Sequence, residues 1–75
     1  MTVYGFYFNP CVEESASMTM SIHFSKENAE AAMKNHKKQE EEIFNETYKD
    51  DEEAKSMFKF DDFKMWYVGE IEILP

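Results

Sequence analysis

The chain has 75 residues, of which 43% are hydrophobic, 16% are aromatic and 32% are charged, and its formal net charge is −8. This length fits a single domain, residues 1–75, and the aromatic content is typical of a folded chain rather than a disordered acidic one. The acidic balance, with basic residues that are all lysine, weighs against direct binding to nucleic acid or to anionic membranes.

The first two predicted elements are strands. Residues 2–9 are β-branched or aromatic on both faces, which is typical of a strand at the centre of a sheet. Asn9-Pro10 ends this strand, and a polar loop follows. Residues 18–24 then alternate, which predicts a half-exposed strand that pairs with the first as a hairpin. Its apolar face would hold Met18, Met20, Ile22 and Phe24.

A long helix is predicted from Ser25, its N-cap, to Tyr48. One stripe of the helix collects Ala29, Ala32, Met33, His36, Ile43, Phe44 and Thr47, with Glu40 in its middle. Either the helix bends near Gln39, or its second half runs past the edge of the sheet. The length favours the second option, because 24 residues span about 36 Å and a short strand spans only about 23 Å.

Two further elements complete the chain. Asp50 or Asp51 is expected to cap a short helix that runs to Phe58, with Ala54, Met57 and Phe58 pointing inward. Residues 60–63 read as a turn, and residues 64–73 as the third strand. One face of this strand would carry Met65, Tyr67, Ile71 and Ile73, and the other Trp66, Val68, Glu70 and Glu72.

Together these elements predict an α+β fold in the order β-β-α-(short α)-β. The three strands would form an antiparallel sheet in the order 2-1-3, because this order places the doubly apolar strand in the centre. The long helix would lie across one face of the sheet.

The sequence offers no strong signature of catalysis or metal binding. His36 and Glu40, one helical turn apart, could act as a base and its orienting carboxylate, but an ordinary helix-surface pair explains them better. The carboxylate clusters lack the glycine of a calcium-binding loop, since no glycine lies between Gly5 and Gly69. We therefore expect no enzyme activity, no cofactor and no dedicated metal site.

Residues 39–53 concentrate the charge, with eight carboxylates and one lysine. If the helix continued through this segment, Glu42, Glu46, Asp50 and Glu53 would form one ridge, with carboxylates about 5–6 Å apart that could imitate a row of phosphates. The alternative is a solvated helix face. The candidate residues for binding a basic partner are Glu40, Glu41, Glu42, Glu46, Asp50, Asp51, Glu52 and Glu53.

A second candidate surface is aromatic. We expect the sheet face away from the helix to expose more apolar surface than a monomer tolerates, so that a second copy or another partner covers it. The alternative for each aromatic residue is a place in the core. The predicted interface residues are Phe58, Phe60, Phe63, Trp66 and Val68.

In its small size, its acidic run EEEIFNETYKDDEE and its lack of arginine, the chain resembles the inhibitors that bacteriophages make against host defence. These anti-CRISPR and anti-restriction proteins include several DNA mimics. The resemblance covers no aligned motif and assigns no residue roles. It implies an inhibitor that acts as a decoy for a basic, nucleic-acid-binding effector. The other hypothesis is a homo-oligomeric interaction module, such as a homodimer, whose charge serves solubility.

The expected compartment is the cytoplasm, which would be the host cytoplasm for a phage-encoded chain. Residues 1–10 have no basic region before their apolar run, unlike a signal peptide, and no apolar stretch is long enough to span a membrane. Cys11 is the only cysteine, so an intrachain disulfide is excluded.

Overall fold

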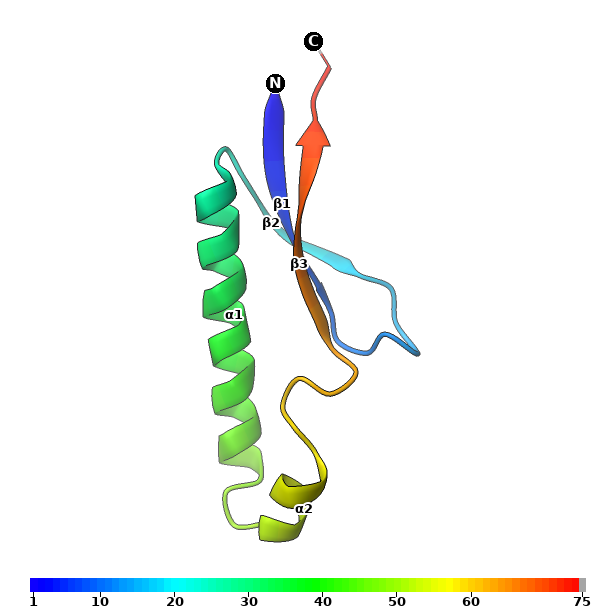
Figure 1. Ribbon diagram of the computed structural model, residues 1–75, viewed down its shortest axis with the longest axis vertical. Coiled ribbons are helices and arrows are strands. Elements are labelled where there is room, and N and C mark those ends of the chain that lie inside the picture. Colours follow the sequence, from blue (N-terminus) through cyan, green and yellow to red (C-terminus); the bar gives the residue numbers. More distant parts are fainter. Residues whose placement is uncertain (75) are drawn as a thin grey trace.

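The computed structural model describes residues 1–74. Its elements follow in the order β1 (Thr2–Asn9), β2 (Met18–His23), α1 (Lys26–Thr47), α2 (Glu52–Met57) and β3 (Met65–Glu72) (Figure 1). The strands form one antiparallel sheet in the order β2-β1-β3. The predicted α+β fold, strand order and sequence of elements are therefore confirmed.

Both helices begin where a side chain caps them. The Ser25 hydroxyl accepts a hydrogen bond of 3.1 Å from the Asn28 amide at the start of α1, as predicted. α1 ends at Thr47, and the amide of Tyr48 donates to the Phe44 carbonyl. Asp51 caps α2, with its carboxylate accepting from the Ala54 amide. The inward side predicted for α2 is wrong for Met57 and Phe58, which are both exposed.

The core lies between α1 and one face of the sheet. His36 of α1 packs its ring 5.5 Å from the ring of Phe6 and 4.6 Å from that of Phe8, measured between centroids. Trp66 stands opposite Phe8 in the sheet, and Val68 stands opposite Phe6. Cross-strand neighbours share a face, so Trp66 and Val68 lie beneath the helix. Their predicted place on the face away from α1 is therefore wrong.

The two faces of β3 are therefore turned the opposite way from the prediction relative to α1. Met65, Tyr67 and Ile71 lie on the side away from α1, while Trp66, Val68, Glu70 and Glu72 share the side that α1 partly covers. Glu70 and Glu72 stay exposed there, because the strands extend past the N-terminal end of α1 (Figure 1).

A β-bulge interrupts the pairing of β1 with β2. The register shifts between Phe6, which faces Ser21, and Tyr7, which faces Thr19. Met20 is the extra residue, so Ile22 and Thr19 lie on one side of the sheet and the strict alternation predicted for residues 18–24 is wrong.

The helix and the sheet are offset along the long axis of the molecule. α1 runs past the sheet at one end, and β1 and β3 run past α1 at the other (Figure 1). The Cα extents are 53 × 24 × 12 Å, and the radius of gyration is 15.0 Å, whereas a compact chain of this length has about 11 Å. The predicted overhang of the helix is confirmed. It places most of the acidic segment beyond the sheet.

Candidate protein-binding site

The overhang forms an acidic tip, which we define as residues 39–57. It comprises the second half of α1, the turn after Thr47 and α2, and it lies at the end of the molecule opposite the chain termini (Figure 1). Seven of the eight predicted acidic residues are exposed here, namely Glu41, Glu42, Glu46, Asp50, Asp51, Glu52 and Glu53. The segment therefore presents its carboxylates to solvent, at the greatest distance from the core.

Glu40, the eighth, is held within the fold. Its side chain is 24% exposed and lies 3.8 Å from His36 Nε2 and 3.6 Å from the ammonium group of Lys64. These two partners explain how a carboxylate is accommodated in the middle of the apolar stripe.

The predicted ridge of four carboxylates is wrong. Glu42 and Glu46 lie one turn apart on α1, but the helix ends at Thr47, Asp50 lies in the turn that follows, and Glu53 belongs to α2. The ammonium group of Lys49 also lies 3.2 Å from the Glu46 carboxylate. The carboxylates therefore form a cluster over two helices and a turn rather than one straight row.

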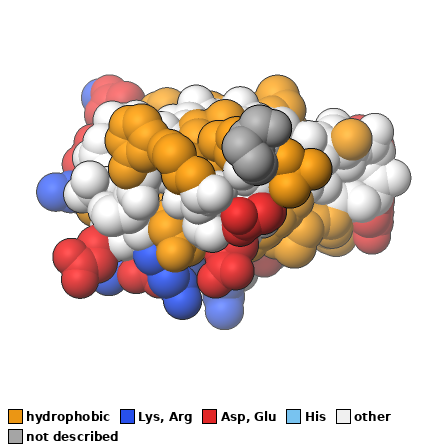
Figure 2. All heavy atoms as spheres, turned by 90° about the horizontal axis from the view of Figure 1, so that it is seen from above, with side chains coloured by type: hydrophobic (Ala, Val, Ile, Leu, Met, Phe, Trp, Pro, Cys, Tyr) orange, Lys and Arg blue, Asp and Glu red, His pale blue; other side chains and the backbone are white. Residues whose placement is uncertain are grey.

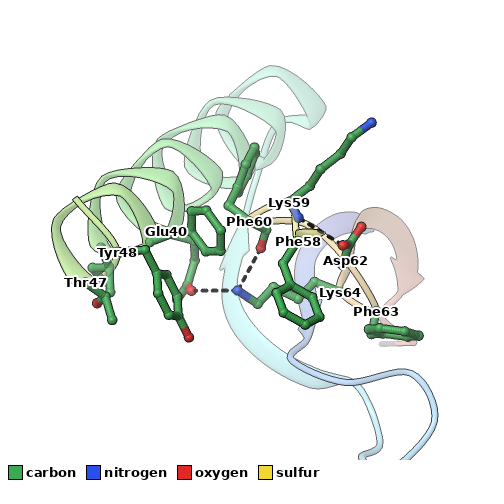
Figure 3. Close-up of a pocket in the computed structure, with 11 residues that line it drawn as sticks. Glu40, Thr47, Tyr48, Phe58, Lys59, Phe60, Asp62, Phe63 and Lys64 are labelled. Carbon is green, nitrogen blue, oxygen red and sulfur yellow. Dashed lines mark hydrogen bonds and ion pairs between the residues drawn. The ribbon is translucent and has the colours of Figure 1, made fainter. Parts of the chain in front are cut away.

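An aromatic groove of about 360 Å³ lies beside the acidic tip, between the second half of α1 and residues 58–64 (Figure 3). The Lys64 ammonium group fixes this arrangement, because it donates a 2.8 Å hydrogen bond to the Phe60 carbonyl and pairs with Glu40 across the groove. The Lys59 amide donates to the Asp62 carboxylate. The aromatic side chains that line the groove are Phe44, Tyr48, Phe58, Phe60 and Phe63.

The loop that forms one wall of the groove is tied back to the body of the protein. Phe63 adopts the left-handed region at φ 63°, which is uncommon for a side chain of this size. Its carbonyl accepts a hydrogen bond of 2.7 Å from the Val12 amide in the loop after β1. This bond links residues far apart in the chain and anchors the loop that carries Phe63, one of the residues that line the groove.

The predicted aromatic surface is thus divided by the fold. Phe58, Phe60 and Phe63 gather around the groove, whereas Trp66 and Val68 pack beneath α1. Sequence reasoning did not assign Phe44 and Tyr48 to this surface, although their rings pack together at 5.0 Å. The apolar stripe of the predicted helix continues past the length that a strand can cover. This continuation was the signal that could have assigned the two residues to the surface.

Ile43 provides an apolar side chain among the acidic ones. It lines the aromatic groove on one side, and on the other a hollow of about 450 Å³ together with Gln39, Glu42, Glu46 and Thr47. Its side chain is 59% exposed. An exposed apolar group flanked by carboxylates is suited to a protein surface that combines an apolar contact with basic residues.

His36 is engaged on both sides of its ring. The Trp66 indole donates a 3.0 Å hydrogen bond to Nδ1, which must therefore be the unprotonated nitrogen, and Nε2 faces Glu40. In this arrangement the imidazole orients the indole and joins the two layers of the core. The pair with Glu40 that the sequence favoured is present at 3.8 Å, and the ring also packs against Phe6 and Phe8, which the sequence did not predict.

In the part of the chain that the structure describes, no three His, Cys, Asp or Glu side chains lie together as metal ligands. Among residues 1–74, no helix has the length and hydropathy needed to cross a bilayer.

Comparisons of the chain with protein-family models, with curated proteins and with solved structures found no match.

Proposed function

We propose that this protein is a non-enzymatic inhibitor that binds a basic, nucleic-acid-binding protein through the acidic tip and competes with its nucleic acid. The observation that carries the proposal is the position of the charge. Seven exposed carboxylates occupy one end of an elongated molecule, outside the region where helix and sheet pack together.

The clustering of these carboxylates supports the proposal energetically. Like charges close together on an exposed surface destabilise a small domain slightly, so the fold gains nothing from concentrating them. A basic cleft that normally holds a phosphate backbone would gain from the same arrangement, because its lysines and arginines would be neutralised. Electrostatic attraction would also accelerate the encounter of the two proteins.

The groove and Ile43 add apolar contacts that a purely electrostatic decoy lacks. Charged groups on the rim of an interface mainly govern the association rate, whereas buried aromatic and aliphatic groups govern the lifetime of the complex. Phe58, Phe63 and Ile43 are exposed next to the acidic tip. We therefore infer that the partner inserts an apolar side chain there and surrounds it with basic residues.

By its acidic run, small size and lack of arginine, the chain is similar in type to phage inhibitors of host defence. On this proposal the protein acts in the cytoplasm of a bacterial host, and its target is an effector that handles DNA or RNA.

The direct test is capture of the target from a bacterial lysate by the immobilised protein, in the presence of nuclease to remove bridging nucleic acid. The bait is compared with a tip variant, Glu42→Lys/Glu46→Lys. A matched control, Glu13→Lys/Glu14→Lys, makes the same change of net charge at two exposed positions in the loop after β1.

The proposal predicts a nucleic-acid-binding protein that the wild type and the loop control retain and the tip variant loses. Equal retention by all three baits, or capture only of proteins without nucleic-acid-binding activity, would contradict it.

A further inference from the structure

The sheet face away from α1, which we call the outer sheet face, carries no charged side chain along β1, β2 and β3. Cross-strand pairing places ten residues on it, namely Val3, Gly5, Tyr7, Asn9, Thr19, Ile22, Met65, Tyr67, Gly69 and Ile71. Val3, Gly5 and Asn9 are buried within the single chain, and the exposed members are Thr19, Ile22, Met65 and Tyr67. In a chain that is 32% charged, a sheet face without any charged side chain is unusual. Exposed strands normally alternate apolar with polar side chains, so that the face turned to solvent is polar.

A tyrosine pair forms the centre of this face. Tyr7 and Tyr67 are direct partners in the sheet, and their rings stack at 4.9 Å between centroids. The Tyr7 ring lies across Gly5 and Gly69, where an added Cβ would approach within 2.8 Å and 3.2 Å of it. The two glycines therefore let a large ring lie flat on the sheet, which leaves a level surface with Ile22, Met65 and Tyr67 exposed around it.

The chain exposes more surface than a compact monomer of its mass. The chain exposes 5605 Å², whereas a compact monomer of its mass, 8.9 kDa, exposes about 4,800 Å². The excess of about 800 Å² belongs to the whole elongated molecule, and each partner of a standard protein interface contributes a similar area. Hydrophobic side chains are also plainly exposed at the end of the molecule that carries both termini (Figure 2).

We propose that the outer sheet face is the interface of a homodimer, with a second copy of this chain as its occupant. The electrostatics favour a second copy over the basic partner of the acidic tip, because the face offers no carboxylate for a cationic surface to neutralise. Two copies of a chain with a net charge of −8 repel each other least when they meet through their uncharged faces. The two sheets would pack about 10 Å apart, with the tyrosine pairs near the twofold axis.

Face-to-face packing is also favoured over pairing of strand edges. The edge strand β3 carries Glu70, which would approach the same charge of another copy, and the free edge of β2 is interrupted by the bulge. Both features are known to discourage edge-to-edge association. This proposal is independent of the proposed function, since the acidic tip lies outside the dimer interface.

The test compares the same substitution, isoleucine to glutamate, at two positions, one inside and one outside the proposed interface. Ile22 on the outer sheet face and Ile43 on α1 have the same side chain and the same exposure, 59%. Sedimentation velocity over a range of concentrations should give a dimer for the wild type, at low and at high salt. Ile22→Glu should raise the dissociation constant of the dimer at least tenfold, because it buries a carboxylate at the interface, and Ile43→Glu should change it less than twofold.

Circular dichroism of each variant establishes that it is folded, and a second measurement does not depend on any variant. Isotope-filtered NOE spectra of a mixed labelled and unlabelled wild-type sample should show contacts between copies from the Ile22 and Ile71 methyl groups to the Tyr67 ring. A wild type that stays monomeric at several hundred micromolar, or a dimer that Ile43→Glu weakens as much as Ile22→Glu, would overturn the proposal. Contacts between copies that come only from α1 or the groove would do the same.

Discussion

The hydrogen bond from Trp66 to His36 is the polar contact that joins the two layers of this small core. The indole donor lies between Phe8, Phe60 and α1, and His36 Nδ1 accepts its hydrogen bond at 3.0 Å. In so small a core, one unpaired polar group is a large fraction of the total stability.

We predict that His36→Phe lowers the free energy of unfolding by about 1 kcal/mol, because it leaves a partly buried donor without an acceptor. Phenylalanine keeps an aromatic ring against Phe6 and Phe8, so the loss reports mainly on the hydrogen bond. Urea unfolding at a fixed protein concentration measures it. Adding Trp66→Phe should restore part of the loss, because the unpaired donor is then gone, and a further fall of equal size would contradict the pairing.

Glu72 offers a test by pH. The Thr2 hydroxyl donates to its carboxylate at 2.7 Å and the N-terminal ammonium lies 3.2 Å away, and these contacts lower the pKa of Glu72 below its ordinary value of 4.5. A carboxyl whose pKa is lowered by folding stabilises the fold above its ordinary pKa, and this contribution is lost as the pH falls through the lowered value. Carboxyl NMR titration should show a higher pKa in Thr2→Val and a pKa close to wild type in Thr2→Ser. Equal pKa values in wild type and Thr2→Val would contradict the assignment.

At the scale of elements, the sequence predicted the strands, the long helix and their order, because these depend on local patterns. The apolar character of residues 2–9 on both faces fixed β1 as the central strand, and Ser25 marked the start of α1. Both signals lie within a few residues of the feature that they predict.

The faces of β3 were predicted wrongly because both of its faces carry apolar side chains. The sequence analysis placed Trp66 and Val68 on the face away from the helix, on the same side of the strand as Glu70 and Glu72. In the structure this side faces α1, and its acids stay exposed because β3 extends past the N-terminal end of α1 (Figure 1). A register between elements far apart in the chain decides this offset, and no local pattern encodes it.

The predicted end of α1 is correct to within a residue. The predicted ridge of four carboxylates nevertheless ran through this end, and the structure breaks it there. Acidic residues recur on both sides of the break, from Glu40 to Glu53, and no glycine or proline marks the break between the helices. Asp51 supplies the signal that was available, since an N-cap at this position requires the preceding helix to have ended.

For α2, we predict that Asp51 acts as a cap rather than only as a charge. Asp51→Asn keeps a good capping oxygen, so exchange of the Ala54 amide hydrogen with solvent should stay near the wild-type rate. Asp51→Ala removes the acceptor and should accelerate this exchange about fivefold, which corresponds to roughly 1 kcal/mol. If the two variants exchange equally fast, the 3.0 Å contact from Ala54 to Asp51 does not stabilise the helix.

At the scale of the whole molecule, chemically different surfaces are separated in space. The acidic tip projects from one end, and the outer sheet face lies on the side of the sheet that α1 leaves open. Four apolar side chains among residues 1–74 form the buried core, namely Val3, Phe6, Phe8 and Ala29, whereas fifteen large hydrophobic side chains in the same range are exposed. We propose that contacts with other proteins cover part of this exposed apolar surface.

The most direct test of the acidic decoy is a competition measurement with the captured target. Fluorescence anisotropy would follow labelled nucleic acid as the wild type, the tip variant Glu42→Lys/Glu46→Lys and the loop control Glu13→Lys/Glu14→Lys displace it from the target. We predict that the wild type and the loop control displace it, and that the tip variant needs at least a tenfold higher concentration, equivalent to about 1.4 kcal/mol. This difference should shrink as salt screens the charges. Displacement by the tip variant at wild-type concentrations in both low and high salt would contradict the decoy mechanism.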